Sequence, residues 1–263
     1  MTSRASTGDD CKHYQLTHSL EETDRRRATS IVTWISTILR RVSTVTPTLY
    51  SLVGKRCLDA SCALLGLVLL SPVLCLAALA VRITSPGPVF FRQARLGQFG
   101  RPFRIFKFRT MVVNNGADGS LLTASGDPRI TRVGRWLRAT KLDELAQLLN
   151  VLRGEMSLVG PRPEVPDYVA FYTERQRQVL LVKPGVTGPA ASMYEEELLA
   201  GQPDKEHFYL TTVLPAKLET DIAYCKNVQC LSDLKLILRT IAKVAVRIGE
   251  LCRLPVSVSQ KEM

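Results

Sequence analysis

The chain has 263 residues, 46% of them hydrophobic, and a formal net charge of +11. This length fits one large domain or two small ones that bury a core. Three scattered histidines and seven cysteines without a Cys-x-x-Cys pair argue against a zinc centre, a histidine triad and a disulfide framework, so catalytic chemistry must rest on Asp, Glu, Lys and Arg. The charge is concentrated in residues 82–141, where twelve Lys or Arg stand against two acidic residues, and this predicts an anionic partner.

The N-terminal segment divides into two parts. Residues 1–30 are polar and charged, which predicts a disordered tail. Residues 31–54 mix Ile, Val, Leu and Trp34 with Thr, Ser, Arg40 and Arg41. That composition suits either an amphipathic interfacial helix or an ordinary packed helix.

Residues 55–83 contain the membrane candidate. The run from Ala60 to Val81 has 22 residues without a charge, and as a straight helix it would measure about 33 Å, enough to cross a bilayer core. Ser71 and Pro72 interrupt its centre, where proline removes a helical hydrogen bond. Both flanks are basic, so both ends favour the cytoplasmic side. A re-entrant helix that dips in and returns fits these facts, and a kinked spanning helix is the alternative.

Asp59 lies at the mouth of this apolar run, where an unpaired charge is unfavourable. Lys55 precedes it by four residues, which is the spacing of an ion pair along a helix. The sequence therefore predicts a structural Lys55–Asp59 pair at the start of the membrane helix.

Short strands and a basic segment follow the turn at residues 84–88. Residues 89–91 and 103–111 read as strands, and in the second of them Lys107 and Arg109 interleave with phenylalanines. Interleaved basic and aromatic residues occur in nucleic-acid-binding proteins. Directly after a membrane segment they fit an anionic headgroup or a diphosphate better, so no nucleic acid is expected as a partner.

Two adjacent carboxylates lie in residues 140–153. Asp143 and Glu144 would stand in the first turn of a helix, whose end favours anions. One carboxylate there can attack phosphorus while the other holds a divalent metal. The alternative is a helix cap built from Thr140 and Asp143. The helix itself is predicted from an apolar stripe at helical spacing, which comprises Leu142, Leu145, Leu148, Leu149 and Leu152.

Rigid turns and a basic helix complete the chain. Arg162 stands between Pro161 and Pro163, which either hold it ready for a phosphate with little loss of entropy or only turn the chain. Residues 183–188 form a second Gly/Pro loop, which either contacts a ligand or only turns the chain. Residues 231–251 predict an amphipathic helix with a basic residue at every fourth position, suited either to an anionic membrane surface or to packing on the domain.

The order of these motifs resembles the bacterial sugar transferases, the monotopic phosphoglycosyl transferases that load a hexose-1-phosphate onto polyprenyl phosphate. The resemblance covers about residues 55–243. It rests on Lys55-Arg56-x-x-Asp59, the apolar run broken at Ser71-Pro72, Ser85-Pro86-Gly87-Pro88, Lys107-Phe108-Arg109-Thr110-Met111, Leu142-Asp143-Glu144-Leu145 with Gln147-Leu148, Ser157-Leu158-Val159-Gly160-Pro161-Arg162-Pro163 and Lys183-Pro184-Gly185-Val186-Thr187-Gly188.

The resemblance implies an α+β, mainly helical, monotopic membrane protein. One re-entrant hydrophobic helix at residues 55–83, broken at Ser71-Pro72, and amphipathic interfacial helices would surround a small cytoplasmic catalytic domain at residues 84–251, with a tail at 252–263. The protein would sit at the cytoplasmic face of the bacterial inner membrane, in contact with anionic lipids. Homo-oligomerisation is left open.

The resemblance also implies a mechanism. Asp143 would attack the sugar-bearing phosphate of a UDP-sugar and release UMP, and polyprenyl phosphate would then take the sugar phosphate from the aspartyl intermediate. Glu144 would bind Mg²⁺. The reaction would initiate a surface polysaccharide or glycoconjugate pathway. The residues expected to contact the substrate are Lys107, Arg109, Pro161, Arg162 and Pro163.

The sequence departs from the family pattern at two places, and two other functions are alternatives to the transferase. Ala146 stands where the family commonly has proline, and residues 189–197 differ from many members, which leaves the sugar open. A membrane phosphohydrolase would use the same carboxylate chemistry with water as the acceptor. A basic membrane adaptor without enzymatic activity would use the acidic pair only as a helix cap.

Overall fold

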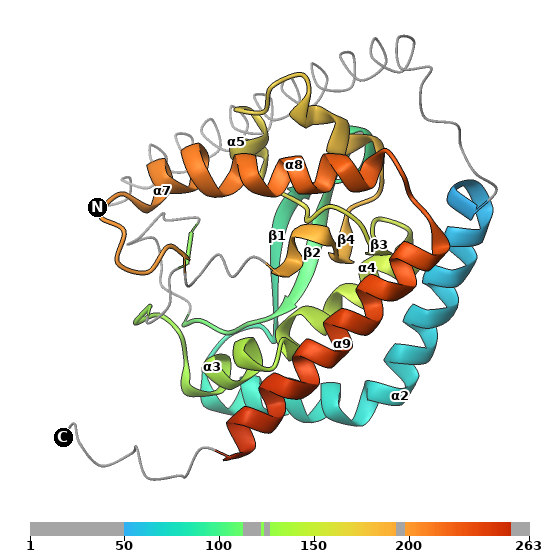
Figure 1. The fold of residues 1–263 in the computed structure, drawn as a ribbon. Helices are drawn as coiled ribbons and strands as arrows, with labels where there is room; N and C mark the ends of the chain where they lie inside the picture. Colours follow the sequence, from blue (N-terminus) through green and yellow to red (C-terminus); the bar gives the residue numbers. More distant parts are fainter. Residues whose placement is uncertain (1–49, 113–121, 124–126, 193–197, 254–263) are drawn as a thin grey trace, which may run out of the picture.

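The computed structural model describes residues 50–112, 122–123, 127–192 and 198–253 (Figure 1). The described chain is mostly helical and carries two small sheets of two strands each, which agrees with the predicted mainly helical α+β class. The predicted tail at 1–30, most of the predicted helix at 31–54 and most of the tail at 252–263 lie outside the described residues. A π-helical turn, η1 (Tyr50–Gly54), leads directly into the first long helix.

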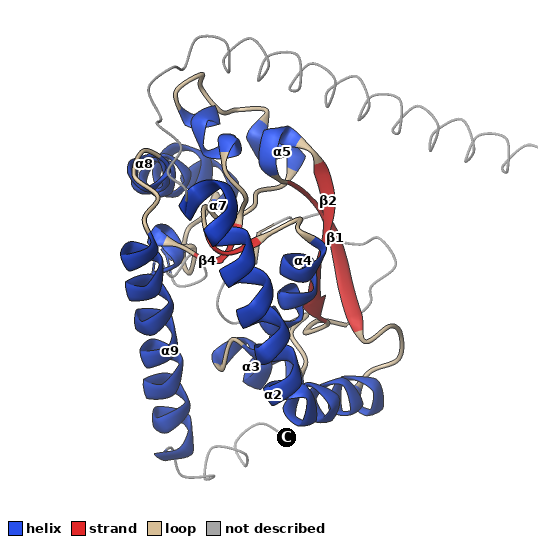
Figure 2. Cartoon of the chain, turned by 90° about the vertical axis from the view of Figure 1, so that its right-hand side faces the viewer, coloured by secondary structure: helices blue, strands red, loops and turns tan. Residues whose placement is uncertain are grey.

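Helix α2 (Lys55–Thr84) is the one described helix that is long and apolar enough to cross a membrane. Its axis changes direction partway along, so that the second half runs at a steep angle to the first (Figures 1 and 2). Pro72 lies inside the helix and cannot donate to the carbonyl four residues earlier, that of Val68. The hydroxyl of Ser71 donates to that carbonyl instead, at 2.8 Å. Helix α2 continues through Ser71 and Pro72 to Thr84, so it is bent and not broken into two helices.

An antiparallel hairpin follows, formed by β1 (Phe90–Leu96) and β2 (Pro102–Phe108) with the short 3-10 turn η2 (Gln98–Gly100) between them. In its register Phe90 faces Phe108 and Leu96 faces Pro102. The buried amide of Asn150 extends the edge of β2, because it accepts from the N–H of Phe106 at 3.0 Å and donates to the carbonyl of Arg104 at 2.9 Å. This side chain joins the hairpin to the helical segment that carries the two carboxylates.

That segment is not the single α-helix predicted over residues 140–153. Helix α3 (Arg132–Ala139) ends at Thr140, Lys141 takes a left-handed conformation with φ 57°, and a 3-10 helix, η3 (Leu142–Gln147), runs into α4 (Leu148–Arg153). The tighter 3-10 turn rotates successive side chains differently from an α-helix. The predicted leucine stripe is therefore wrong in part: Leu148 is buried, but the other leucines are only partly so, and the remaining buried positions are Asp143, Ala146, Gln147, Asn150 and Val151.

The rest of the domain packs around a short parallel sheet. Strand β3 (Ser157–Val159) pairs with β4 (Gly185–Thr187), and Gly160 follows β3 so closely against the second Gly/Pro loop that a Cβ there would lie 2.4 Å from the carbonyl oxygen of Lys183. Helix α8 (Leu214–Cys225) supplies much of the main core. The shorter elements of this region are α5 (Pro166–Val169), η4 (Gln176–Leu181), η5 (Pro189–Ser192), α7 (Lys205–Phe208) and η6 (Tyr209–Val213).

Helix α9 (Cys230–Arg253) confirms the predicted C-terminal helix and extends it slightly. It runs diagonally across one side of the molecule, and its C-terminal half stands apart from the other described elements (Figures 1 and 2). Exposed apolar side chains line it, including Leu234, Leu238 and Ile241. The domain holds its N-terminal half through the buried carboxylate of Asp233, through Leu236 and Ile237, which pack on the main core, and through the hydroxyl of Thr240, which lies 2.7 Å from that of Thr187.

Candidate active site

Asp143 and Glu144 lie in η3, which packs against β2. Two cations from different parts of the chain meet Glu144. Lys107 of β2 donates to Oε1 at 3.0 Å, while Arg162, from the loop after β3, donates to Oε1 at 2.7 Å and to Oε2 at 3.2 Å. The structure thus brings together four of the predicted site residues, namely Lys107, Asp143, Glu144 and Arg162. The first and the last of them are 55 positions apart in the sequence.

Asp143 has a different environment from its neighbour. Its side chain is buried, and Oδ1 has no hydrogen-bond partner among the residues that the structure describes. Burial first and the charge of Glu144 second raise the pKa of Asp143 to about 6, against the opposing effect of Lys107 and Lys141. A buried carboxylate oxygen without a donor is weakly solvated when ionised and is therefore a competent nucleophile.

The pKa of Glu144 moves in the opposite direction. Burial alone would raise it, but Arg162 and Lys107 outweigh burial and hold the pKa well below its usual value. Burial also lowers the pKa of Lys107, although Glu144 opposes that shift. Adjacent carboxylates whose pKa values are driven apart are typical of acid–base and nucleophilic sites, because each is prepared for a different role.

The helix-cap alternative for this pair is not supported by the geometry. The hydroxyl of Thr140 donates to the carbonyl of Trp136 at 2.9 Å and so belongs to the end of α3. The residue that precedes η3 is Lys141, and no side chain caps this helix start. Among the described residues, neither Thr140 nor Asp143 therefore caps this helix start.

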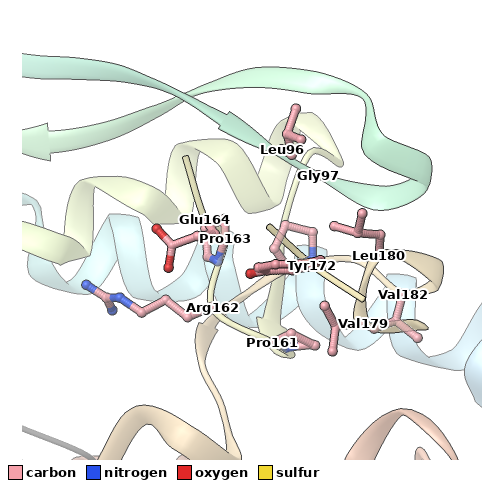
Figure 3. A pocket seen from close by; sticks show the side chains of 11 residues that line it. Leu96, Gly97, Pro161, Arg162, Pro163, Glu164, Tyr172, Val179, Leu180 and Val182 are labelled. Carbon is pink, nitrogen blue, oxygen red and sulfur yellow. The ribbon is translucent and has the colours of Figure 1, made fainter. Parts of the chain in front are cut away.

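Arg162 extends from a rigid loop. Pro161 and Pro163 flank it and line a small pocket with apolar side chains such as Tyr172 and Leu180. Figure 3 shows the guanidinium of Arg162 reaching away from these apolar side chains. Next in the chain, the buried Glu164 accepts from Arg95 at 2.9 Å and from the hydroxyl of Tyr209 at 2.5 Å, which fastens the loop to β1 and η6.

Arg109 lies elsewhere. Its buried guanidinium donates to the carbonyls of Pro86 at 2.6 Å and Ser85 at 2.7 Å, and to the hydroxyl of Ser85 at 2.9 Å. It also reaches the carbonyl of Val81 at 3.4 Å. These contacts tie the C-terminal end of α2 to the residue after β2 and give Arg109 a structural role, while its contact with substrate stays a prediction.

The predicted Lys55–Asp59 pair does not form. Lys55 makes an ion pair with Asp233 at the start of α9, and Asp59 accepts a hydrogen bond from the backbone N–H of Leu158 at 3.0 Å. Both acids are buried, but Asp59 faces the backbone of β3, and this leaves Lys55 to pair with Asp233 of α9. Neither contact has a spacing signal in the sequence, because both join residues about a hundred or more positions apart.

Sequence reasoning also missed three positioning side chains, namely Asn150, Glu164 and Asp233. Asn150 follows Asp143 by seven residues and, in the predicted α-helix, falls off the leucine stripe, so no sequence signal marked it as buried. The acids Glu164 and Asp233 carry no such signal, because their partners come from distant elements.

Together these features define a protein in which one long apolar helix is attached to a compact site of two carboxylates and two cations. The model of the family described as bacterial sugar transferase matches residues 50–247. The chain belongs to this family, and the predictions of the family and of transferase activity are confirmed.

Curated relatives include enzymes of defined reaction. A UDP-glucose:undecaprenyl-phosphate glucose-1-phosphate transferase of Caulobacter vibrioides is 42% identical over 190 residues, 71% of this chain and 68% of that protein. The enzyme of the same name from Escherichia coli is 39% identical, but this chain covers only 39% of its length. A sugar transferase of Bacillus subtilis, EpsL, is 38% identical over 74% of this chain and 89% of its own.

The opposed pKa shifts of the pair predict opposite effects on stability. Because the folded pKa of Asp143 lies above its ordinary value of 3.8, the folded state binds the proton more tightly, and stability falls as the pH rises through about 6. Asp143→Asn should therefore raise the free energy of unfolding at pH 8 by about 2 to 3 kcal/mol, and by less at pH 4.5. Unfolding followed in detergent at the two pH values measures the difference.

Glu144→Gln is the control, because it should change the free energy of unfolding in the opposite direction. The folded pKa of Glu144 is lowered, so its contribution to stability is present above its ordinary pKa and is lost on acidification. This variant should be less stable than the wild type at pH 8 and approach it at low pH. A stabilising effect of both substitutions at pH 8, or of neither, would contradict the electrostatic description of the pair.

A second prediction concerns Arg109. Replacement by Met leaves buried carbonyls at the end of α2 without donors, which should lower the free energy of unfolding by about 2 to 4 kcal/mol. Arg109→Lys should recover part of that loss. Normal stability together with weakened nucleotide-sugar binding in Arg109→Met would instead return Arg109 to the substrate-binding residues.

Proposed function

We propose that this protein transfers a sugar-1-phosphate from a UDP-sugar to undecaprenyl phosphate or a related polyprenyl phosphate. The observation that carries the proposal is the buried, unpartnered Oδ1 of Asp143 beside a carboxylate that two cations hold ionised. The Caulobacter, Escherichia coli and Aeromonas hydrophila relatives carry names of this reaction type, with glucose or N-acetylgalactosamine as the sugar. In this proposal the reaction begins the assembly of a surface polysaccharide or glycoconjugate.

The first step forms an aspartyl phosphosugar. An oxygen of Asp143 attacks the sugar-bearing phosphorus of the UDP-sugar, the phosphoanhydride bond breaks, and UMP leaves with the bridging oxygen. In the second step an oxygen of polyprenyl phosphate attacks the same phosphorus and displaces Asp143, which regenerates the carboxylate. Lys107 and Arg162 supply the positive charge that such phosphates require at the reacting centre.

Mg²⁺ fits this site as a substrate-linked ion. Magnesium is usually held by one or two carboxylates together with phosphate oxygens and water. No cluster of three or more His, Cys, Asp or Glu side chains exists among the described residues, so the protein would offer Glu144, and phosphate oxygens and water would supply the other ligands. When bound, the ion would neutralise diphosphate charge, and Glu144 would exchange a contact with Lys107 or Arg162 for it.

The membrane arrangement extends the same proposal. The apolar side chains of α2, such as Leu65, Val68 and Leu76, are exposed in the protein and suit a lipid environment. The bend at Ser71-Pro72 and the basic flanks favour a re-entrant helix on the cytoplasmic side of the inner membrane. Helix α9, with its exposed leucines and its basic residues Lys235 and Arg239, suits the surface of anionic lipids.

The direct test is UMP release from a panel of UDP-sugars by the purified protein. Wild-type protein should release UMP with turnover only when Mg²⁺ and polyprenyl phosphate are present, and the rate should rise with pH through about 6 as Asp143 ionises. Asp143→Asn should reduce the rate by more than about a thousandfold while the protein stays folded. Asp204→Asn, at an exposed helix cap, is the matched control and should leave the rate unchanged.

Three outcomes would contradict the proposal. Turnover of a phosphate ester without polyprenyl phosphate would indicate a phosphohydrolase. Undiminished turnover by Asp143→Asn would remove Asp143 as the nucleophile. Absence of release from every UDP-sugar by folded protein would favour the adaptor function.

Topology is tested by labelling single cysteines with a membrane-impermeant maleimide. Cys57 lies exposed at the start of α2, and Arg82→Cys would place an exposed thiol near its end. In an otherwise cysteine-free protein, both thiols should react from the cytoplasmic face if the helix is re-entrant. Reaction of the two thiols from opposite faces would establish a spanning helix.

A further inference from the structure

The first two turns of α2 contact both chain segments that lead to the proposed active site. Arg56 donates to the carbonyls of Val151 at 2.5 Å and Leu152 at 2.7 Å, at the end of α4. These donors satisfy carbonyls that a helix end leaves without partners. The base of the membrane helix therefore holds the helical segment that begins with Asp143 and Glu144.

Asp59 holds the second segment, which carries Arg162. The N–H of Ser157 donates towards β4, to the carbonyl of Pro184 at 2.8 Å. The next N–H along the strand, that of Leu158, points to the other side, where Oδ1 of Asp59 accepts it at 3.0 Å. Asp59 is only 2% exposed, so its carboxylate replaces the strand partner that β3 lacks on this side.

A second contact reinforces this attachment one residue further along. The hydroxyl of Tyr224 lies 2.7 Å from Oδ1 of Asp233 and 3.3 Å from the carbonyl oxygen of Val159. Asp233 in turn pairs with Lys55 and accepts from the hydroxyl of Tyr50 at 2.7 Å. The start of α2 is thus bonded to β3 directly through Asp59 and indirectly through Asp233 and Tyr224.

The chain between Asp59's contact and the site is short and stiff. Arg162 follows Leu158 by four positions, which is about 13 Å of extended chain. Gly160 packs against the backbone at Lys183 with no room for a side chain, and Pro161 and Pro163 restrict the backbone on both sides of Arg162. A displacement at Leu158 is therefore transmitted to the guanidinium that holds Glu144.

We propose that Asp59 is a positioning residue of the active site, which sets the place of Arg162 through its hydrogen bond to the backbone of Leu158. This role rests on the proposed function and adds to it: the membrane helix not only attaches the protein to lipid but also sets the geometry of its phosphate-binding arginine. This role requires a side-chain oxygen that accepts the N–H of Leu158. Asp59→Asn keeps such an oxygen and should preserve the role, whereas Asp59→Ala removes it and should not.

Hydrogen exchange tests the contact without any enzymatic assay. In the full-length protein in detergent, Asp59→Ala should accelerate exchange about tenfold at the amides of Leu158, Val159, Gly160 and Arg162, and Asp59→Asn should not. Asp204→Ala is the matched control, because Asp204 also accepts a backbone N–H, that of His207 at 2.9 Å. It should leave residues 158–162 unchanged. Unchanged exchange at these amides in Asp59→Ala would overturn the proposal.

UMP release then tests the positioning role. Asp59→Ala should lower kcat/KM by between about tenfold and about a hundredfold, while Asp59→Asn should stay within about threefold of the wild type. In an Arg162→Lys background, Asp59→Ala should have little further effect, because the group it positions is already altered. A loss that Asn does not rescue, or that persists in full in that background, would overturn the role.

The two proposals fail in different ways. If wild-type protein releases no UMP from any UDP-sugar, the proposed reaction is wrong, and the exchange experiment still decides whether Asp59 holds residues 158–162. If UMP is released normally by Asp59→Ala although exchange there is faster, the reaction stands and the positioning role is wrong.

Discussion

Two neighbouring carboxylates can be buried together in ionised form only if positive charge compensates for them, and in this protein the direct contacts with cations fall on one of the two. Lys107 and Arg162 both contact Glu144, at 3.0 and 2.7 Å, while Oδ1 of Asp143 remains without a donor among the described residues. The result is an ionised Glu144 beside an Asp143 with a raised pKa. Because the two cations come from β2 and from the loop after β3, the site exists only when both elements are docked on η3.

Much of the surrounding fold serves that docking. Asn150 bonds the edge of β2 to α4, and Glu164 bonds the arginine loop to β1 and η6. The base of α2 reaches both the end of α4 and β3 through Arg56 and Asp59. An apolar helix suited to lipid is therefore also part of the frame of the site, which gives membrane attachment and catalysis a shared structural basis.

The sequence predicted the elements whose signals are local. The long apolar helix that contains Ser71-Pro72, the strands on either side of residue 100, the C-terminal amphipathic helix and the family itself follow from composition, periodicity and motif order. Local signals misled where a special backbone conformation intervened. Left-handed Lys141 and the 3-10 helix η3 displaced the expected helix start at Thr140 and most of the buried leucine stripe.

By itself, then, the sequence determined which residue types are candidates for the chemistry: adjacent acids, an arginine between prolines and a basic strand. Only the tertiary structure decided their partners. It placed Lys107 and Arg162 beside Glu144, and it turned Arg109 towards the end of α2. Lys55 and Asp59 do not pair with each other: Lys55 pairs with Asp233, and Asp59 accepts from the backbone of Leu158. The physical reason is that hydrogen bonds and ion pairs depend on distance in space, and these join residues from 18 to 178 positions apart along the chain.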